Sequence, residues 1–369
     1  GIVGAAFLIT WAAEVAQMDI SAALALAILA LVAVLPEYAV DMVFAWKAGA
    51  HPEGLMVGGE LVNYKSYAAA NMTGGNRLLV GIGWPLVALL FWLKQRKSVH
   101  LGRGVSLELI FLGAATLYSF LIVIRREIAL WDAGVLIGLF VVYVWFSGKG
   151  KKEEPALMGP AASLGALSKL WRRLWVLFLF IFAAAVIILS AEPFAEGLIA
   201  VGKEMGIDEF ILVQWVAPLA SESPEIIVAC ILALSARPTM AMMALISSKV
   251  NQWTLLVGTL PVVFSASLGR ASGLALDARQ TEEFLLTAAQ SLFAVVLLTR
   301  MEIGRWAALV LFLLFATQLA LPSVTVRYIF SFAYLGLAVG LLAVDRVRLA
   351  LIKEMALAVW AEARGKGNA

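Results

Sequence analysis

The chain has 369 residues, of which 62% are hydrophobic and 14% are charged, and its mean hydropathy is +0.93. These values exceed what the core of a soluble protein requires, so the composition predicts an integral membrane protein in contact with lipid. The formal net charge of +3 is small, and a basic surface facing anionic lipid accounts for it, so nucleic acid is not expected as a partner. The single cysteine, Cys230, excludes a disulfide bond within one chain.

Eleven apolar stretches recur along the chain, each close to the length of about 20 residues that is needed to cross the hydrocarbon of a bilayer. They cover residues 2–17, 20–46, 67–93, 104–124, 127–147, 172–202, 208–236, 239–268, 281–299, 303–321 and 325–344. The first stretch is shorter than the one at 172–202, and neither a basic region nor a cleavage pattern precedes it. We therefore expect the true N-terminus to be missing or processed.

Lysine and arginine residues gather in the loops that follow odd-numbered stretches and in the C-terminal tail. These residues are Lys94, Arg96, Lys97, Arg103, Lys149, Lys151, Lys152, Lys169, Arg172, Arg173, Arg346, Arg348 and Lys353. Loops rich in lysine and arginine stay on the cytoplasmic side of a membrane. We therefore expect an integral protein of the plasma (inner) membrane, with its N-terminus outside and its C-terminus in the cytoplasm.

One segment, residues 148–171, is rich in glycine, proline and charge and separates two hydrophobic blocks. It predicts a cytoplasmic linker between a first repeat at 1–147 and a second repeat at 172–321, with an extra span and a cytoplasmic tail at 322–369. Each repeat holds five stretches, and an odd number makes the second repeat enter the membrane in the opposite sense. The predicted fold is therefore an all-α polytopic membrane protein with two inverted five-helix repeats and one additional C-terminal transmembrane helix.

Two Pro-Glu pairs lie in matching places within these repeats. The first is in VLPEYAVDMV at 34–43, which contains Glu37, and the second is in ASESPEIIVA at 220–229, which contains Glu225. A glutamate in hydrocarbon is costly and is by default a functional-site hypothesis, and proline next to it predicts a broken helix. Broken helices in corresponding positions of two halves are the best sequence indication of an ion site. The alternative, a carboxyl group that only stabilises the helix break, stays open.

Three neighbouring residues have less certain roles. Asp41 lies one turn after Glu37 and could be a cation ligand, a proton relay or the partner of a lysine or arginine. Glu222 could reach either the site or an aqueous vestibule. Arg77 requires neutralisation within the membrane, and we expect its partner to be Asp41, Glu60 or Glu222.

A second matched stretch follows in each repeat. The first reads ANMTGGNRLLVGIGWPLV from Ala70 and the second reads LISSKVNQWTLLVGTLPVVF from Leu245, which makes Asn76 and Asn251 equivalent. Amide and carboxylate oxygens are the hard ligands that Na⁺ and Ca²⁺ prefer. The two matched pairs of segments together predict a cation site near the middle of the membrane.

These segments resemble the paired G-T-S-x-P-E and G-N-x-x-G-S-N-x-x-N motifs of the calcium/cation antiporter superfamily, the sodium/calcium exchangers and their relatives, over roughly residues 1–321. The resemblance implies that Glu37 and Glu225 are the two central carboxylates that bind the cation, and are thus its metal ligands. It also implies a cytoplasmic central linker and sliding or rocking of the first and sixth spans. Other positions that match the motifs are Asn71, Asn76, Ser221 and Asn251.

The chain also departs from the motifs of that superfamily. In the first repeat, Val32, Ala33 and Val34 supply no side-chain oxygen, and Leu79 stands at the last motif position. The second repeat keeps oxygens, on Ser221, Glu222, Ser223 and Thr254. A site with several cation ligands in the superfamily is thus expected to be smaller here.

Lys249 is the departure with the greatest consequence, because it stands where the motif has glycine. An ammonium group within reach of Glu37 or Glu225 would act as a tethered cation in place of a bound one. Such a pair can also exchange a proton as an ion enters, so Lys249 is a candidate coupling residue. The alternatives are a static ion pair or a side chain that extends to the membrane interface.

The sequence lacks a G-x-x-x-x-G-K-[ST] phosphate loop, an H-E-x-x-H zinc motif and a G-x-S-x-G elbow, so transport is expected to draw on ion gradients without a cofactor. The predicted function is secondary-active antiport, with Ca²⁺ as the best guess for the substrate and Na⁺ or H⁺ as counter-ion. One alternative is a monovalent cation/proton antiporter with Lys249 as the tethered cation. A passive cation channel and an intramembrane enzyme are weaker alternatives, because no nucleophile is present and a channel would need an open path.

Overall fold

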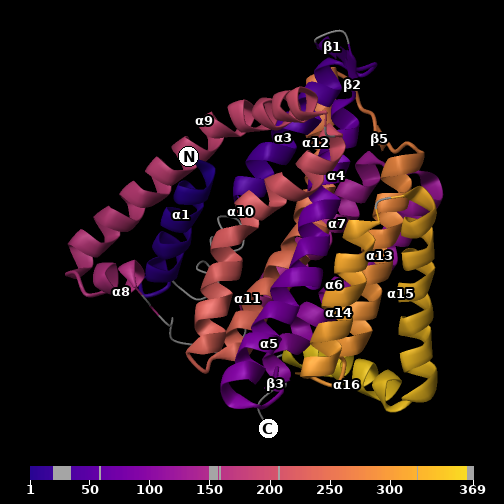
Figure 1. Ribbon diagram of the computed structural model, residues 1–369. Helices are drawn as coiled ribbons and strands as arrows, with labels where there is room; N and C mark the ends of the chain where they lie inside the picture. The colour runs from indigo at the N-terminus through magenta and orange to yellow at the C-terminus, as the bar shows by residue number, and fades with distance from the viewer. Residues whose placement is uncertain are drawn as a thin grey trace.

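The computed structural model describes residues 1–19, 35–57, 60–148, 157, 159–206, 208–321 and 323–363, and helices dominate them (Figure 1). In the first half the helices are α1 (Ile2–Ala16), α3 (Leu35–Ala50), α4 (Tyr64–Leu78), α5 (Trp84–Gln95), α6 (Ser106–Arg125) and α7 (Leu130–Ser147). In the second half they are α9 (Lys169–Met205), α10 (Glu209–Leu234), α11 (Pro238–Asn251), α12 (Val257–Leu268), α13 (Ala278–Leu298) and α14 (Arg305–Ala320), after the short α8 (Pro160–Gly165). The last two are α15 (Val324–Val344) and α16 (Val347–Ala363).

Within the described residues, seven helices are long and apolar enough to cross a membrane. They start at Tyr64, Ser106, Leu130, Lys169, Glu209, Ala278 and Val324. The first of these runs without interruption through α4 and α5, as the single predicted stretch 67–93 requires. Shorter apolar helices, α1 and α14, cover the predicted stretches 2–17 and 303–321. Residues Val32, Ala33 and Val34 lie outside the described residues, and so do positions 149–156 and 158 of the predicted linker.

Each half contains one π-helical turn inside a long helix. The turn η1 (Leu79–Gly83) joins α4 to α5, and η3 (Gln252–Leu256) joins α11 to α12. Both turns follow closely after the equivalent residues Asn76 and Asn251, and π turns are frequent at functional sites. In the first half the next turn contains Pro85, which lacks an N–H and leaves the carbonyl of Gly81 without its usual donor. The irregularity is thus repeated where the sequence motifs are repeated.

Short strand pairs at opposite ends of the bundle show the inverted relation of the halves (Figure 1). The pairs are β3 (Val99–His100) with β6 (Glu302–Ile303), and β4 (Glu127–Ile128) with β5 (Leu274–Ala275), both antiparallel. In one pair the Leu101 N–H donates to the Met301 carbonyl at 2.8 Å, and in the other the Leu276 N–H donates to the Arg126 carbonyl at 2.8 Å. Both acceptor residues have left-handed backbone angles, with φ of 54° and 56°. A further hairpin, β1 (Leu55–Val57) with β2 (Glu60–Val62), follows α3.

The core of the bundle places α4 and α10 side by side, with α3 and α11 packed against them. At this contact Gly74 of α4 meets the backbone of α10, because a Cβ atom on Gly74 would lie 1.8 Å from the Gln214 carbonyl oxygen. Only glycine permits so close an approach of two helices. This contact brings the motif segments of the two halves together.

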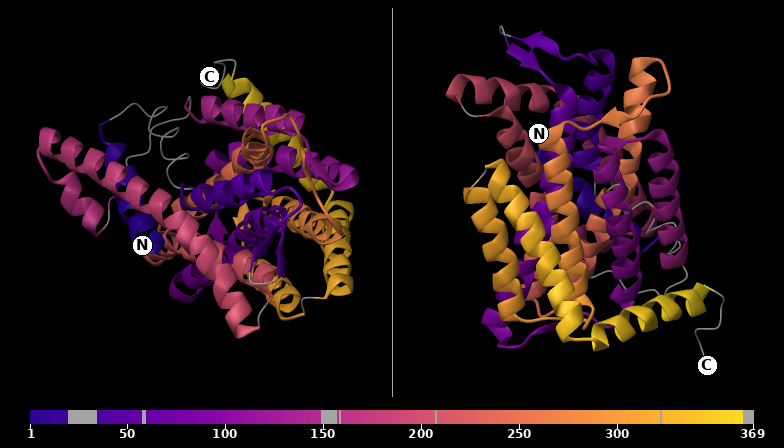
Figure 2. Two further views of the ribbon diagram at one scale, coloured as in Figure 1. Left: turned by 90° about the horizontal axis from the view of Figure 1, so that it is seen from above. Right: turned by 90° about the vertical axis from the view of Figure 1, so that its right-hand side faces the viewer.

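Two groups of helices lie at the periphery of this core. The helices α1 and α9 pack against each other along one side of the molecule (Figures 1 and 2). On another side α15 packs against α13, and α16 then runs across the end of the bundle (Figure 2). The apolar α15 is the additional C-terminal helix that the sequence predicts, whereas α16 is a helix where only a tail is predicted.

Candidate functional site

The Pro-Glu segment of the second half is an unbroken helix, which corrects the prediction of a helix break at Pro224. The helix α10 continues through both Pro218 and Pro224. Pro224 frees the Ala220 carbonyl, and the Ser223 hydroxyl donates to that carbonyl at 3.2 Å. Serine side chains commonly satisfy backbone groups that proline frees inside a membrane. The Ser221 hydroxyl likewise donates to backbone carbonyls, those of Ala217 and Pro218, each at 3.2 Å.

Three carboxyl groups from the two halves meet between α3 and α10. Glu37, in the first turn of α3, lies within interaction range of Glu222, Glu225 and Ser221 of α10. Glu37 and Glu222 are only 4% and 1% exposed, so Glu222 is enclosed beside Glu37 and does not face an aqueous vestibule. One oxygen of Glu222 accepts a hydrogen bond from the Gln252 amide, while its other oxygen and Oε1 of Glu225 are buried without a partner.

Lys249 is fully buried at this site, with 0% of its surface exposed. Its Nζ donates to the Asn76 backbone oxygen at 2.9 Å and to Asn76 Oδ1 at 3.2 Å, and it lies 5.5 Å from the centre of the Trp253 ring. The carboxyl group that interacts electrostatically with this ammonium group is that of Glu222, which corrects the expectation that Glu37 or Glu225 lies within its reach. Because the side chain is enclosed, it does not extend to the membrane interface. The tethered ammonium thus occupies the oxygens of Asn76 that the family resemblance assigns to a cation.

The remaining predicted site residues are fixed by neighbouring polar groups. The Tyr38 hydroxyl donates to Asn251 Oδ1 at 3.1 Å, which joins α3 to α11. The Asn71 amide donates to Asp41 Oδ1 at 2.9 Å, and the other oxygen of Asp41 has no partner although the residue is fully buried. The Thr254 hydroxyl donates to the Val250 carbonyl at 2.5 Å, so it stabilises the start of the π turn.

The arrangement combines several acidic groups with one buried base. Among the described residues, no group of three or more His, Cys, Asp or Glu side chains has the geometry to hold a metal ion. Neighbouring buried carboxyl groups disfavour being charged together unless a cation lies close to them.

Comparison with known proteins gives the family. The model described as sodium/calcium exchanger protein matches residues 1–149 and 175–324. The chain belongs to the sodium/calcium exchanger protein family. It is 48% identical to the H⁺/Ca²⁺ exchanger CAX, whose crystal structure superposes with a TM-score of 0.92 over 98% of this chain and 89% of that chain. No curated protein sequence matches the chain.

The sodium-calcium exchanger NCX_Mj shares the fold at much lower sequence identity. The structure soaked with 2.5 mM Na⁺ and 10 mM Sr²⁺ is 17% identical, with a TM-score of 0.57 over 86% of this chain and 94% of that chain. The structure soaked with 10 mM Na⁺ and zero Ca²⁺ is 16% identical with the same TM-score of 0.57. These matches confirm the predicted fold of two inverted helical repeats.

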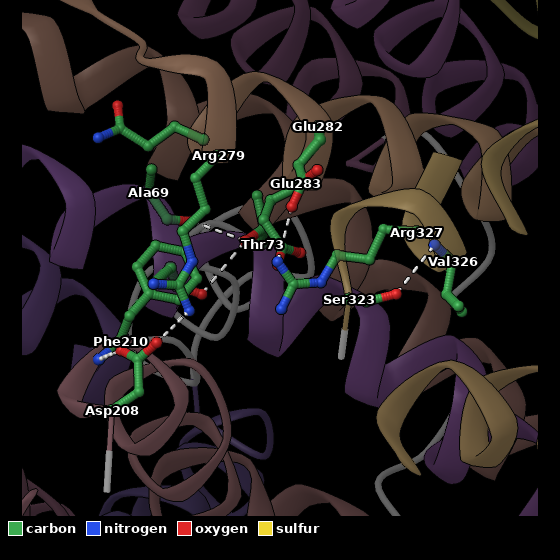
Figure 3. Close-up of polar contacts among 12 residues, drawn as sticks. Ala69, Thr73, Asp208, Phe210, Arg279, Glu282, Glu283, Ser323, Val326 and Arg327 are labelled. Carbon is green, nitrogen blue, oxygen red and sulfur yellow. Dashed lines mark hydrogen bonds and ion pairs between the residues drawn. The ribbon is translucent and has the colours of Figure 1, made fainter. Parts of the chain in front are cut away.

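The partner of Arg77 is Glu283, which corrects the prediction of Asp41, Glu60 or Glu222. Arg77 forms a buried ion pair with Glu283 of α13. The Arg327 Nη1 of α15 lies 2.7 Å from Glu282 and 2.9 Å from Glu283 (Figure 3). Sequence reasoning missed this cluster of two arginines and two glutamates. The signal was available, since two adjacent glutamates within the predicted span 281–299 and an arginine within the predicted span 325–344 require partners.

Proposed function

We propose that this protein is a proton-coupled cation antiporter that carries Ca²⁺ at the site between α3, α4, α10 and α11. The observation that supports this most is the meeting of the buried Glu37 and Glu222 with the half-buried Glu225, next to the buried ammonium group of Lys249. The proton is preferred as counter-ion because the chain is 48% identical to an H⁺/Ca²⁺ exchanger over 98% of its length. Na⁺ is the counter-ion that this proposal rejects.

The carboxyl groups would exchange their protons for the cation. Ca²⁺ needs ionised carboxylates, so its entry releases the protons that Glu37 and Glu225 carry in its absence. Two protons leaving as one divalent ion enters keep the charge of the site constant, which a low-dielectric surrounding favours. Asn251, Ser221, Ser223 and Thr254 would add neutral oxygens. The hydroxyl groups can do so while donating to the helix backbone, because each hydroxyl retains acceptor lone pairs.

Lys249 would set which ions enter. Its ammonium group donates hydrogen bonds to both oxygens of Asn76, so a cation that binds these oxygens must displace the lysine. This observation favours a second candidate function, antiport of a monovalent cation and protons, in which Lys249 permanently replaces one bound cation. Asp41 and Asn71 would act as a relay or as support one turn along α3. Access would alternate as the packed pair α1 and α9 slides or rocks, which their position beside the core permits (Figure 1).

Flux measurements in liposomes test the proposal. We expect Ca²⁺ uptake under an outward proton gradient, and none under an outward Na⁺ gradient at equal pH. Glu225→Gln should abolish uptake, whereas Glu204→Gln, which changes an exposed carboxyl group at the end of α9, should leave it intact. Uptake driven by Na⁺ alone would reject proton coupling. Proton-driven flux of Na⁺ or K⁺ without Ca²⁺ would favour the monovalent alternative.

The proposed orientation is separately testable. We propose the inner membrane, with the N-terminus outside and the tail inside, from the distribution of lysine and arginine residues. A single cysteine introduced into α16 of a Cys230→Ser variant should react with an impermeant thiol reagent only in inverted vesicles. Reaction in intact cells would reverse the assignment.

A further inference from the structure

A cavity of about 90 Å³ lies beside the cluster of Arg77, Glu282, Glu283 and Arg327, apart from the carboxyl site described above. Its polar wall consists of Arg77, Gln214, Gln318 and Arg327, and the rest of the wall is apolar. These residues come from α4, α10, α14 and α15. The volume is enough for about three water molecules or for a small ion with part of its hydration shell.

The glutamines at this cavity have unused hydrogen-bonding groups. Both side-chain atoms of Gln318 and the Nε2 of Gln214 are buried without a partner, and the two residues are only 3% and 1% exposed. A buried amide without a partner is costly, so native proteins place water or a ligand against it. The unsatisfied amide groups therefore indicate that the cavity holds water or a polar ligand.

The wall of the cavity offers positive charge and N–H groups. Arg327 uses Nη1 for Glu282 and Glu283 (Figure 3). Arg77 uses Nη2 for Glu283, and its Nε donates to the Thr73 carbonyl at 3.4 Å. Each guanidinium has five N–H donors, so both retain donors beyond these contacts. The two carboxylates contact the arginines but do not line the cavity. A cation there would face two guanidinium groups, whereas an anion would face four donor side chains.

We propose that this cavity binds a small monovalent inorganic anion of the size of chloride. The anion accepts hydrogen bonds from the guanidinium groups of Arg77 and Arg327 and from the amide groups of Gln214 and Gln318, and the Gln318 oxygen accepts from an accompanying water molecule. It joins the ends of α14 and α15 to α4 and α10. Because Arg77 directly follows Asn76, the anion stabilises the segment that holds Lys249 without being transported.

Bromide is the probe that tests this site directly, since it replaces chloride and scatters anomalously. Crystals of the wild-type protein grown in bromide should show an anomalous peak inside the cavity. The thermal midpoint of the purified protein should also rise with chloride or bromide, and saturate, compared with gluconate at equal ionic strength. Absence of the peak, or equal midpoints in chloride and gluconate, means that the cavity holds only water and overturns the proposal.

A conservative variant tests the assignment of the residues. Gln318→Leu removes one donor to the anion and should raise the half-saturating chloride concentration by roughly 10- to 100-fold. Gln95→Leu, an exposed glutamine at the end of α5, is the matched control and should respond as the wild type does. An unchanged chloride response in Gln318→Leu overturns the site. The bromide experiment needs no variant and remains decisive if Gln318→Leu does not fold.

Discussion

The close contact between α4 and α10 makes Gly74→Ala a sharp test of how the site is assembled. The added Cβ atom would lie 1.8 Å from the Gln214 carbonyl oxygen, and an ordinary contact between carbon and oxygen is about 3.3 Å or more. If the helices separate along this line, they must move apart by about 1.5 Å. Lys249 and Gln252 lie on the segment α11–η3, where Lys249 bonds to Asn76 of α4 and Gln252 to Glu222 of α10, so the separation would lengthen at least one of these two hydrogen bonds.

Gly74→Ala should change the free energy of unfolding in the opposite direction from a Gly→Ala substitution at a helix position with open space around it. Alanine in place of glycine inside a helix contributes about 1 kcal/mol of stabilisation, whereas overpacking a close contact costs about 1–3 kcal/mol or more. Gly74→Ala should therefore destabilise the protein and reduce transport. Gly138→Ala in α7 is the matched control, because its Cβ atom would meet nothing within 4 Å, and it should be neutral or stabilising.

Scanning fluorimetry in one detergent and at one heating rate compares the two variants, together with Ca²⁺ uptake in liposomes. The thermal midpoint should fall for Gly74→Ala and should stay or rise for Gly138→Ala. A Gly74→Ala protein that is as stable as the wild type and transports normally would refute the reasoning that this contact positions the site.

Three further outcomes follow from buried and exposed charges. Glu283→Gln leaves the buried Arg77 without its carboxylate partner and should lower the free energy of unfolding by about 3–5 kcal/mol, measured as a lower thermal midpoint. Adding Arg77→Met to this variant should recover most of the lost stability. Additive losses of stability in the double variant would contradict the pairing. Hydrogen bonding to Arg300 lowers the pKa of Asp345 in the folded protein. The pair therefore stabilises the folded protein fully at pH values above the pKa of an unfolded aspartate, about 3.9, and this stabilisation is lost as the pH falls through the lower pKa of the folded state. The midpoint difference between wild type and Asp345→Asn should thus stay constant from about pH 8 to 5 and shrink below about pH 4, and a difference that changes near pH 7 would contradict this cause. Lys249→Ala should alter ion selectivity and the pH dependence of uptake, and unchanged transport would exclude Lys249 as a tethered cation.

The sequence predicts the architecture well because the bilayer imposes strong local rules. Apolar length identifies the spans, and an odd number of spans in each half determines the inverted relation. The paired positions of Glu37 and Glu225 locate the candidate site, since a carboxyl group in hydrocarbon is too costly to occur twice without a reason. These inferences need only composition and spacing.

The details that the sequence does not give depend on contacts between distant segments. Pro224 predicts a broken helix, but the Ser223 hydroxyl satisfies the freed carbonyl and the helix continues. The pairing of Arg77 with Glu283 joins α4 to α13, and no periodic pattern indicates which of several glutamates lies opposite. The placement of Lys249 against Asn76 arises in the same way, from the close approach of the two halves.

The measurement that tests the central claim most directly follows Ca²⁺ and protons in the same liposomes. Ca²⁺ is added outside, and a dye inside reports the luminal pH while a second dye reports Ca²⁺. Ca²⁺ entry should make the lumen more alkaline, because protons leave in exchange. Glu225→Gln should abolish both signals, whereas Glu204→Gln should retain both. Ca²⁺ entry without a proton-dependent pH change, or with an absolute requirement for luminal Na⁺, would contradict proton-coupled exchange at this site.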